Sequence, residues 1–264
     1  RGTNKFTAFA TPFIGAFIYV LLQVFSADIL GFFGFSVDRF KLIIGNGFLA
    51  IVLFSPSGSA TPYYAEFGWV AAAGSTVRLP DQHTLWQQEG SGSLAPNSPV
   101  TLKYDNSDGL TFRRTIAVDD RYLFTIKDDV SNVGAAPVTL YPFALISRHG
   151  KPEVSGYYIL HEGLVGVLGE KSLQEYTYSS IEEKKTVNFD VTNGWLGITD
   201  KYWAATLLPD NNAHLKARFS AGMLGTTKTY QTDYLLDAVT IAPGATGAAN
   251  ARLFAGAKEV QVVN

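Results

Sequence analysis

From about residue 53 onward the chain consists of short β-prone runs separated by turn residues, and this pattern restricts the fold more than any other feature. Runs rich in Val, Ile, Phe, Tyr and Thr recur with Gly, Pro, Ser, Asn or Asp between them. Within residues 121–129, 187–192 and 214–220, apolar and polar side chains alternate. Strands with one apolar and one polar face are typical of antiparallel sheets that pack face to face.

Turn residues and one short helical stretch complete this pattern. Residues 105–109 (DNSDG) separate two β-prone runs and predict a hairpin loop. Residues 179–185 are the best helix signal and predict two turns at most. Gly163, Gly166 and Gly169 recur every third residue, and we expect them to let backbones pack closely. With about a dozen such strands, the predicted fold class is all-β, with two large antiparallel sheets packed on each other.

The first 52 residues differ from the rest because they hold only six charged side chains. Residues 6–27 carry none, and about twenty apolar residues let a helix cross ~30 Å of hydrocarbon. Arg1 and Lys5 precede this stretch and would place the N-terminus on the cytoplasmic side. We predict a membrane anchor helix in residues 1–28, with a signal peptide or a buried hairpin of the β domain as alternatives. Residues 29–52 are predicted to be an apolar connector or membrane-surface segment, because three charges interrupt them.

Composition excludes several classes of function. The chain has 21 basic and 23 acidic side chains and a net charge of −2, whereas nucleic-acid-binding proteins usually carry a basic excess. We therefore predict no nucleic-acid partner. The absence of cysteine excludes disulfides, thiolate chemistry and Cys-ligated metal clusters. Charged residues make up only 17% of the chain, which excludes a disordered tail or a coiled coil.

The sequence lacks the motifs of common enzymes. It contains no GxSxG, no dinucleotide-binding GxGxxG, no Walker loop and no HExxH. We predict no catalytic residue, no metal site and no cofactor. One alternative stays open, because a sugar epimerase built on a β-sandwich needs a His acid and a Glu base across one cleft. The candidates for that pair are His149 or His161 with Glu153 or Glu162.

Aromatic side chains are the candidates for contact with a partner. Trp69, Trp195, Tyr202 and Trp203 could line a peptide groove or stack on a sugar, because an aromatic ring offers a large apolar face. These four are the predicted site residues. For each of them, packing in the core or at a sheet edge is the alternative.

Three long segments carry a resemblance to a known family. Residues 54–71, 161–210 and 241–259 resemble, in the same order, the large periplasmic domain of the YidC family of bacterial membrane-protein insertases. Within them, GWLGITDKYW at 194–203 precedes a strand that ends in Pro-Asp, as in that family. The resemblance extends over residues 53–264 and implies a β-supersandwich, a fold shared with sugar mutarotases, without mutarotase chemistry.

The resemblance also implies a location and partners. It makes residues 53–264 a periplasmic β domain that follows an N-terminal membrane helix in the bacterial inner membrane. The implied partners are the lipid bilayer, a Sec-type translocon and nascent membrane proteins, bound without catalysis. In that family the insertion machinery follows this domain, so we expect it to lie outside a chain that stops at Asn264. Two other classes remain as alternatives: a mutarotase-like carbohydrate-active enzyme and an accessory subunit of a larger membrane complex.

Overall fold

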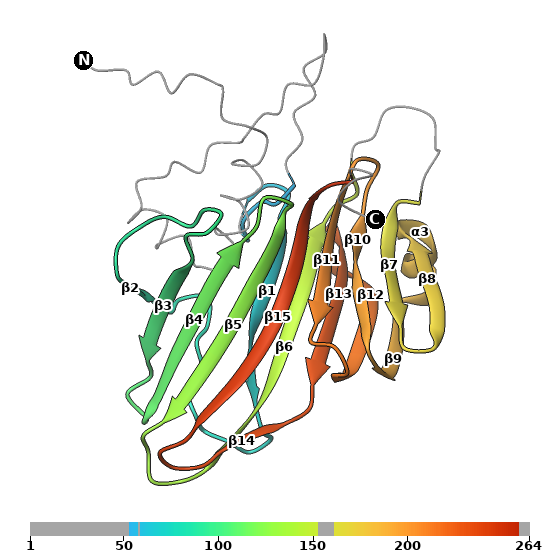
Figure 1. Cartoon of the computed structure of the whole chain (residues 1–264). Helices are drawn as coiled ribbons and strands as arrows, with labels where there is room; N and C mark the ends of the chain where they lie inside the picture. The colour runs from blue at the N-terminus through green and yellow to red at the C-terminus, as the bar shows by residue number, and fades with distance from the viewer. Residues whose placement is uncertain (1–52, 58, 153–160, 259–264) are drawn as a thin grey trace, which may run out of the picture.

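The computed structural model describes residues 53–57, 59–152 and 161–258 (Figure 1). The anchor predicted for residues 1–28 and the connector predicted for residues 29–52 lie outside these ranges. Within them, no helix combines the length and the hydropathy that a membrane crossing requires.

The larger of two sheets has nine strands in the spatial order β2-β3-β4-β5-β15-β11-β10-β7-β8. All neighbouring pairs are antiparallel. The strands are β2 (Gln87–Glu89), β3 (Val100–Asp105), β4 (Leu110–Val118), β5 (Leu123–Asn132), β7 (Gly163–Leu168), β8 (Lys171–Thr177), β10 (Gly194–Thr199), β11 (Trp203–Pro209) and β15 (Thr246–Ala257). The predicted hairpin at residues 105–109 is present, since it joins β3 to β4.

The smaller sheet has six strands, with the order β1-β6-β13-β12-β9 and β14 paired to β6. Its strands are β1 (Tyr63–Ala71), β6 (Val138–His149), β9 (Thr186–Thr192), β12 (His214–Leu224), β13 (Thr227–Leu236) and β14 (Val239–Ile241). These pairs are antiparallel too. The prediction of an all-β fold with two antiparallel sheets is confirmed.

The core lies between the two sheets because most strands turn an apolar face inward. Phe124, Phe219 and Tyr230 are among the largest side chains that are fully buried there. On β5, and on residues 214–220 of β12, every second residue is buried, as the alternation in the sequence predicts. Burying this apolar surface supplies the main favourable free energy of folding, on the order of 2 kcal/mol for each large side chain.

One short helix, α3 (Tyr178–Lys184), lies between β8 and β9 and agrees with the helix predicted at residues 179–185. Thr177 caps its N-terminus, since its hydroxyl oxygen accepts a hydrogen bond from the Ser180 amide at 3.1 Å. Ile181 is fully buried and fixes the helix to the core.

An ion pair is buried within the sandwich. The Arg114 guanidinium on β4 donates to both carboxylate oxygens of Asp128 on β5, at 2.6 and 2.5 Å. It also donates to the backbone oxygen of Phe67 on β1 at 2.8 Å. Since β1 is an edge strand of the smaller sheet, Arg114 satisfies a carbonyl group that has no strand partner on that side.

The two ends of the sandwich are built differently. We call the end at which the described chain starts the near end. Ser55 pairs there with Tyr63, which pairs in turn with Arg148 at the end of β6. Arg148 pairs with Tyr230, so the β12–β13 turn also lies at the near end (Figure 1, top). The opposite end, with the β3–β4 and β5–β6 hairpins, is the far end (Figure 1, bottom).

Candidate functional site

A pocket of about 490 Å³ opens on the face of the nine-stranded sheet that points away from the core; we call it the outer pocket. Its lining comes from β7, β10, β11, β15 and the loops that join them: Val167, Gly169, Asn193, Gly194, Trp195, Leu208, Pro209, Asp210, Asn211, Asn212 and Arg252. Its volume falls within the range of about 300–1,000 Å³ that is typical of small-molecule sites.

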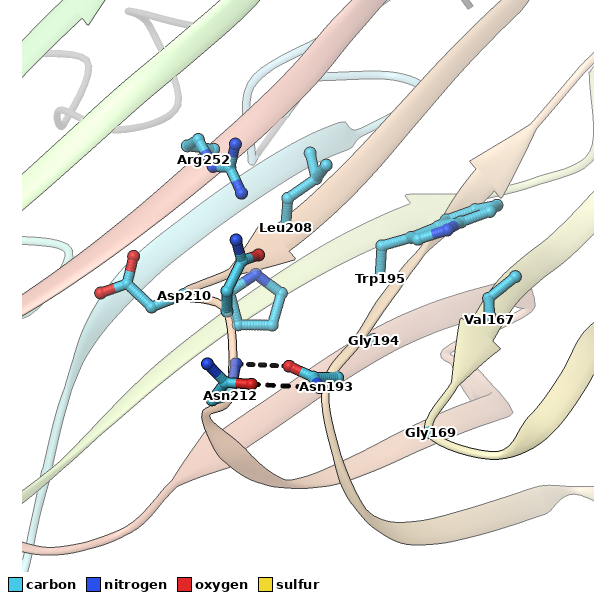
Figure 2. Close-up of a pocket in the computed structure, with 11 residues that line it drawn as sticks. Val167, Gly169, Asn193, Gly194, Trp195, Leu208, Asp210, Asn212 and Arg252 are labelled. Carbon is cyan, nitrogen blue, oxygen red and sulfur yellow. Dashed lines mark hydrogen bonds between the residues drawn. The ribbon is translucent and has the colours of Figure 1, made fainter. Parts of the chain in front are cut away.

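Strand alternation places the floor of the outer pocket. Leu196, Leu207 and Leu253 are fully buried in the core, so their neighbours Trp195, Leu208 and Arg252 point to the opposite face. The sheet register brings these neighbours into one row, because Val167 pairs with Trp195 and Leu208 pairs with Arg252. Figure 2 shows the row running from Arg252 through Leu208 to Trp195 and Val167.

Glycines hold the backbones beneath Trp195 close together. A Cβ on Gly166 would lie 2.7 Å from the backbone oxygen of Trp195, and a Cβ on Gly194 would lie 2.7 Å from that of Val167. A Cβ on Gly163 would meet the Tyr176 oxygen at 2.2 Å. The backbone-packing role predicted for the glycine repeat is therefore confirmed at Gly163 and Gly166.

Two asparagines close the rim of the outer pocket on the far-end side. The Asn193 side-chain oxygen accepts a hydrogen bond from the backbone amide of Asn212 (Figure 2). Both residues have positive φ, 66° for Asn193 and 65° for Asn212, a region that asparagine tolerates better than most residues. Asn193 also accepts from the Gly169 amide through its backbone oxygen, at 2.9 Å. These bonds join three loops, so the rim is formed before any ligand arrives.

The chemistry of the outer pocket is mixed. Trp195, Leu208 and Val167 are partly exposed apolar groups on the floor. Within the described ranges, no hydrogen bond or ion pair engages the Arg252 guanidinium, which leaves its donors available to a carboxylate or a backbone carbonyl. The Asp210 carboxylate accepts one hydrogen bond, from the side-chain amide of Asn250 at 3.1 Å. An aromatic face beside free polar groups suits an amphipathic ligand such as an extended peptide.

The structure separates the four predicted site aromatics. Only Trp195 lines the outer pocket. Trp69 is 7% exposed and packs in a second core cluster at the far end. Trp203 packs partly buried against the main core, whereas Tyr202 is 51% exposed in the β10–β11 turn at the near end. Of the four, Trp195 lines the outer pocket and Tyr202 is the most exposed ring.

The histidines of the epimerase alternative contact groups other than a glutamate among the described residues. His161 hydrogen-bonds the backbone oxygen of Leu164 at 3.1 Å, and the ring of His149 lies 6.1 Å from that of Tyr64. Burial lowers the pKa of His149. No hydrogen bond joins a histidine to a glutamate in the described part of the chain, and Glu153 lies outside it. The same ranges hold no cluster of three potential metal ligands.

The sequence signals for the remaining lining residues are weak. Arg252 and Leu208 come from strands that are distant in sequence, so only the sheet register shows that they meet. Asn193 and Asn212 read as ordinary turn residues in the sequence. A signal was present for the buried pair, since Arg114 falls in phase with Phe112 and Ile116 on the apolar face of its strand.

Comparison with known proteins gives one consistent family. The family described as "YidC periplasmic domain" matches residues 45–264. The membrane protein insertase YidC of Nitrobacter hamburgensis is 70% identical over 227 residues, which are 86% of this chain and 37% of that protein. That of Bradyrhizobium diazoefficiens is 71% identical over 213 residues, or 81% and 34% of the two chains. The chain thus spans about a third of the length of these curated relatives.

A solved structure shows the same fold at low identity. A galactose mutarotase related enzyme from Lactobacillus acidophilus superposes with a TM-score of 0.50 and 8% identity. The match covers 66% of this chain and 72% of that one. At such an identity the similarity concerns the fold alone. It agrees with the prediction of a fold shared with sugar mutarotases.

Proposed function

Because this chain belongs to the YidC family of membrane protein insertases and carries the family's periplasmic domain, we propose that its sandwich is a binding domain. In this proposal the domain holds a partner or substrate chain and catalyses no reaction. The curated relatives bear the name of an insertase, which supports a role in placing other proteins in the membrane.

The proposal includes a location and partners. The domain faces the periplasm from the bacterial inner membrane, anchored through residues 1–28. Its partners are the bilayer and other membrane proteins, namely nascent chains or a Sec-type translocon. The insertion core would belong to the part of the relatives that this chain does not span.

The observation that carries the proposal is the outer pocket. It is open, it faces away from the core, and Arg252 and Trp195 have capacity for a ligand. Its hydrogen-bonded rim, in which Asn193 joins Asn212, lowers the ordering cost of binding. A chain emerging from a membrane in extended form offers backbone carbonyls to Arg252 and apolar side chains to Trp195.

Site-specific cross-linking tests the proposal. A photoreactive benzoylphenylalanine replaces Leu208 in the full-length insertase, and Leu85, a 65% exposed leucine outside the pocket, is replaced as the matched control. Membrane-protein insertion is then started in membrane vesicles, and the samples are irradiated. We expect cross-links to the inserting chain or to a translocon subunit from position 208 and background levels from position 85.

A second variant separates recognition from mere proximity. Trp195→Ala removes the stacking face from the pocket floor, and it should reduce the cross-link yield from position 208 several-fold. Equal yields from positions 208 and 85, or a yield from position 208 that ignores Trp195→Ala, would refute a binding role for the outer pocket.

A further inference from the structure

Two adjacent apolar side chains are exposed at the near end. In the hairpin between β12 and β13, Met223 is 60% exposed and Leu224 is 64% exposed. Of the exposed large apolar side chains in the described ranges, these two alone are neighbours in sequence. Tyr202, 51% exposed, lies in the β10–β11 turn at the same end. Such side chains at the tip of a hairpin contribute nothing to the core.

Five lysines lie on segments at the same end as this tip. They come from the β6 end, the C-terminus of α3, the β10–β11 turn and the start of β13: Lys151, Lys184, Lys185, Lys201 and Lys228. On α3, the β6 end and the start of β13, Lys151, Lys184, Lys185 and Lys228 outnumber Glu182 and Glu183, whereas in the β10–β11 turn Lys201 stands next to Asp200. The segments that adjoin the tip are thus basic, although the chain as a whole has a net charge of −2. Positive charge is therefore gathered where the apolar tip projects.

Hydrogen bonds and ion pairs hold the β12–β13 hairpin against α3. Glu182 binds Lys228 at 2.6 Å and Lys151 at 2.8 Å, and it accepts a hydrogen bond from the Tyr230 hydroxyl at 2.5 Å. The Ala221 amide donates to the Lys185 backbone oxygen at 2.8 Å, which ties the hairpin to α3. The hairpin therefore projects in one orientation relative to the sandwich (Figure 1).

We propose that the near end docks on the surface of an anionic lipid bilayer, with Met223 and Leu224 entering the headgroup layer. This inference rests on the proposed function, because it needs the domain to lie beside the membrane. Exposed apolar side chains beside basic groups are typical of interfacial membrane contact, in which lysines meet anionic headgroups. The position of Leu53 agrees, since the predicted membrane-surface segment, residues 29–52, directly precedes this end in sequence.

The absence of cysteine makes a direct test simple. Met223→Cys carries an environment-sensitive NBD dye in the full chain, reconstituted into vesicles of phosphatidylcholine and phosphatidylglycerol that contain a nitroxide-labelled lipid. Val133→Cys is the matched control, because Val133 is 75% exposed and lies in the β5–β6 loop at the far end. We expect blue-shifted, nitroxide-quenched emission at position 223 and water-like, unquenched emission at position 133.

Charge variants identify the lipid. Lys201→Gln or Lys184→Gln should each shift the docked-to-free ratio about fivefold toward the free domain, as expected for one basic residue near an anionic surface. Vesicles of phosphatidylcholine alone should weaken the quenching in the same sense. Water-like emission at position 223 would overturn the proposal. A blue shift without nitroxide quenching would also overturn it, because the tip would then contact protein.

The vesicle experiment contains no substrate and no translocon. Failure of the outer-pocket cross-links would therefore leave the lipid contact measurable, and failure of the lipid contact would leave the cross-linking test intact. The two proposals can fail separately.

Discussion

At the far end of the sandwich the polar side chains of Asn106 and Asn132 point inward, whereas at the near end the apolar side chains of Met223 and Leu224 point outward. Both asparagines are 1% exposed. Asn132 donates to the backbone oxygens of Ala136 and Ile241, at 2.8 and 3.0 Å, and accepts from Gly134. The far end thus uses buried polar side chains to satisfy its own loops, while the near end exposes two adjacent apolar side chains. Buried polar side chains of this kind stabilise the loops that they join, and the exposed pair is the basis of the contact that we propose for the near end.

The largest effect is expected at Asn132. Asn132→Ala leaves two buried carbonyls and one amide without their partner, and it should lower the free energy of unfolding by about 3 kcal/mol. Urea unfolding followed by circular dichroism measures this loss in the free energy of unfolding. The control is Asn188→Ala on the exposed face of β9, for which we expect a change within about 0.5 kcal/mol. A loss below about 1 kcal/mol at Asn132 would contradict the role given to the far end.

A glycine pair compares the two ends directly. Gly109 at the far end has φ +90°, and an added Cβ would lie 2.8 Å from the Gly134 Cα. Gly150 at the near end has φ +82° and open space around it. Gly109→Ala should therefore cost about 2 kcal/mol or more, and Gly150→Ala about 1 kcal/mol, by the same unfolding measurement. Equal losses would mean that the far end is no more crowded than the near end.

A smaller effect concerns pH at the near end. Lys151, Lys228 and Tyr230 hydrogen-bond Glu182 and lower the pKa of its carboxyl to about 2, well below the usual value of 4.5. The ionised carboxylate therefore stabilises the fold above pH 4.5, and this contribution is lost as the pH falls toward 2. Glu182→Gln should be less stable than the parent at pH 7, and the difference should shrink on acidification.

The control for this pH effect is Glu183→Gln. Glu183 is exposed on the same helix and forms no ion pair within the described ranges. Its variant should follow the parent at every pH. If Glu182→Gln lowered the free energy of unfolding equally at pH 7 and pH 3, the ion pairs of Glu182 would not be the cause of the loss.

The smallest effect on stability is expected at the tip of the near end. Leu224→Ser should change the free energy of unfolding by less than about 0.5 kcal/mol, because the residue is 64% exposed. Leu215→Ala on the same strand, where the side chain is fully buried, should cost roughly 2–5 kcal/mol. A large loss for Leu224→Ser would show that the tip supports the fold, and the contact role would lose its basis.

Much of the fold could be predicted from the sequence because a strand with one buried face leaves a local alternation of apolar and polar residues. The alternation at residues 121–129 places Phe124 and Ile126 in the core, as observed. The hairpin at residues 105–109 and the helix at Tyr178–Lys184 depend on local signals and were predicted within one residue. The family resemblance was likewise carried by contiguous segments.

The sites were harder to predict because they depend on register. Trp195 joins the outer pocket and Trp69 joins the core, although both are tryptophans beside glycine, because their strands present different faces. Arg252 reaches the pocket through the pairing of β15 with β11, which no local pattern specifies. The near end combines four separate segments, so its basic and apolar groups could not be grouped from sequence alone.

The position of β15 has a consequence for the order in which the domain can fold. β15, the last strand of the described chain, lies in the middle of the larger sheet, between β5 and β11. Ser131 on β5 hydrogen-bonds Thr246 on β15, 115 residues later. During synthesis or export from the N-terminus, β5 and β11 therefore keep open edges until Thr246–Ala257 emerges. The domain closes late, and the chain must be protected from pairing with others until its last strand arrives.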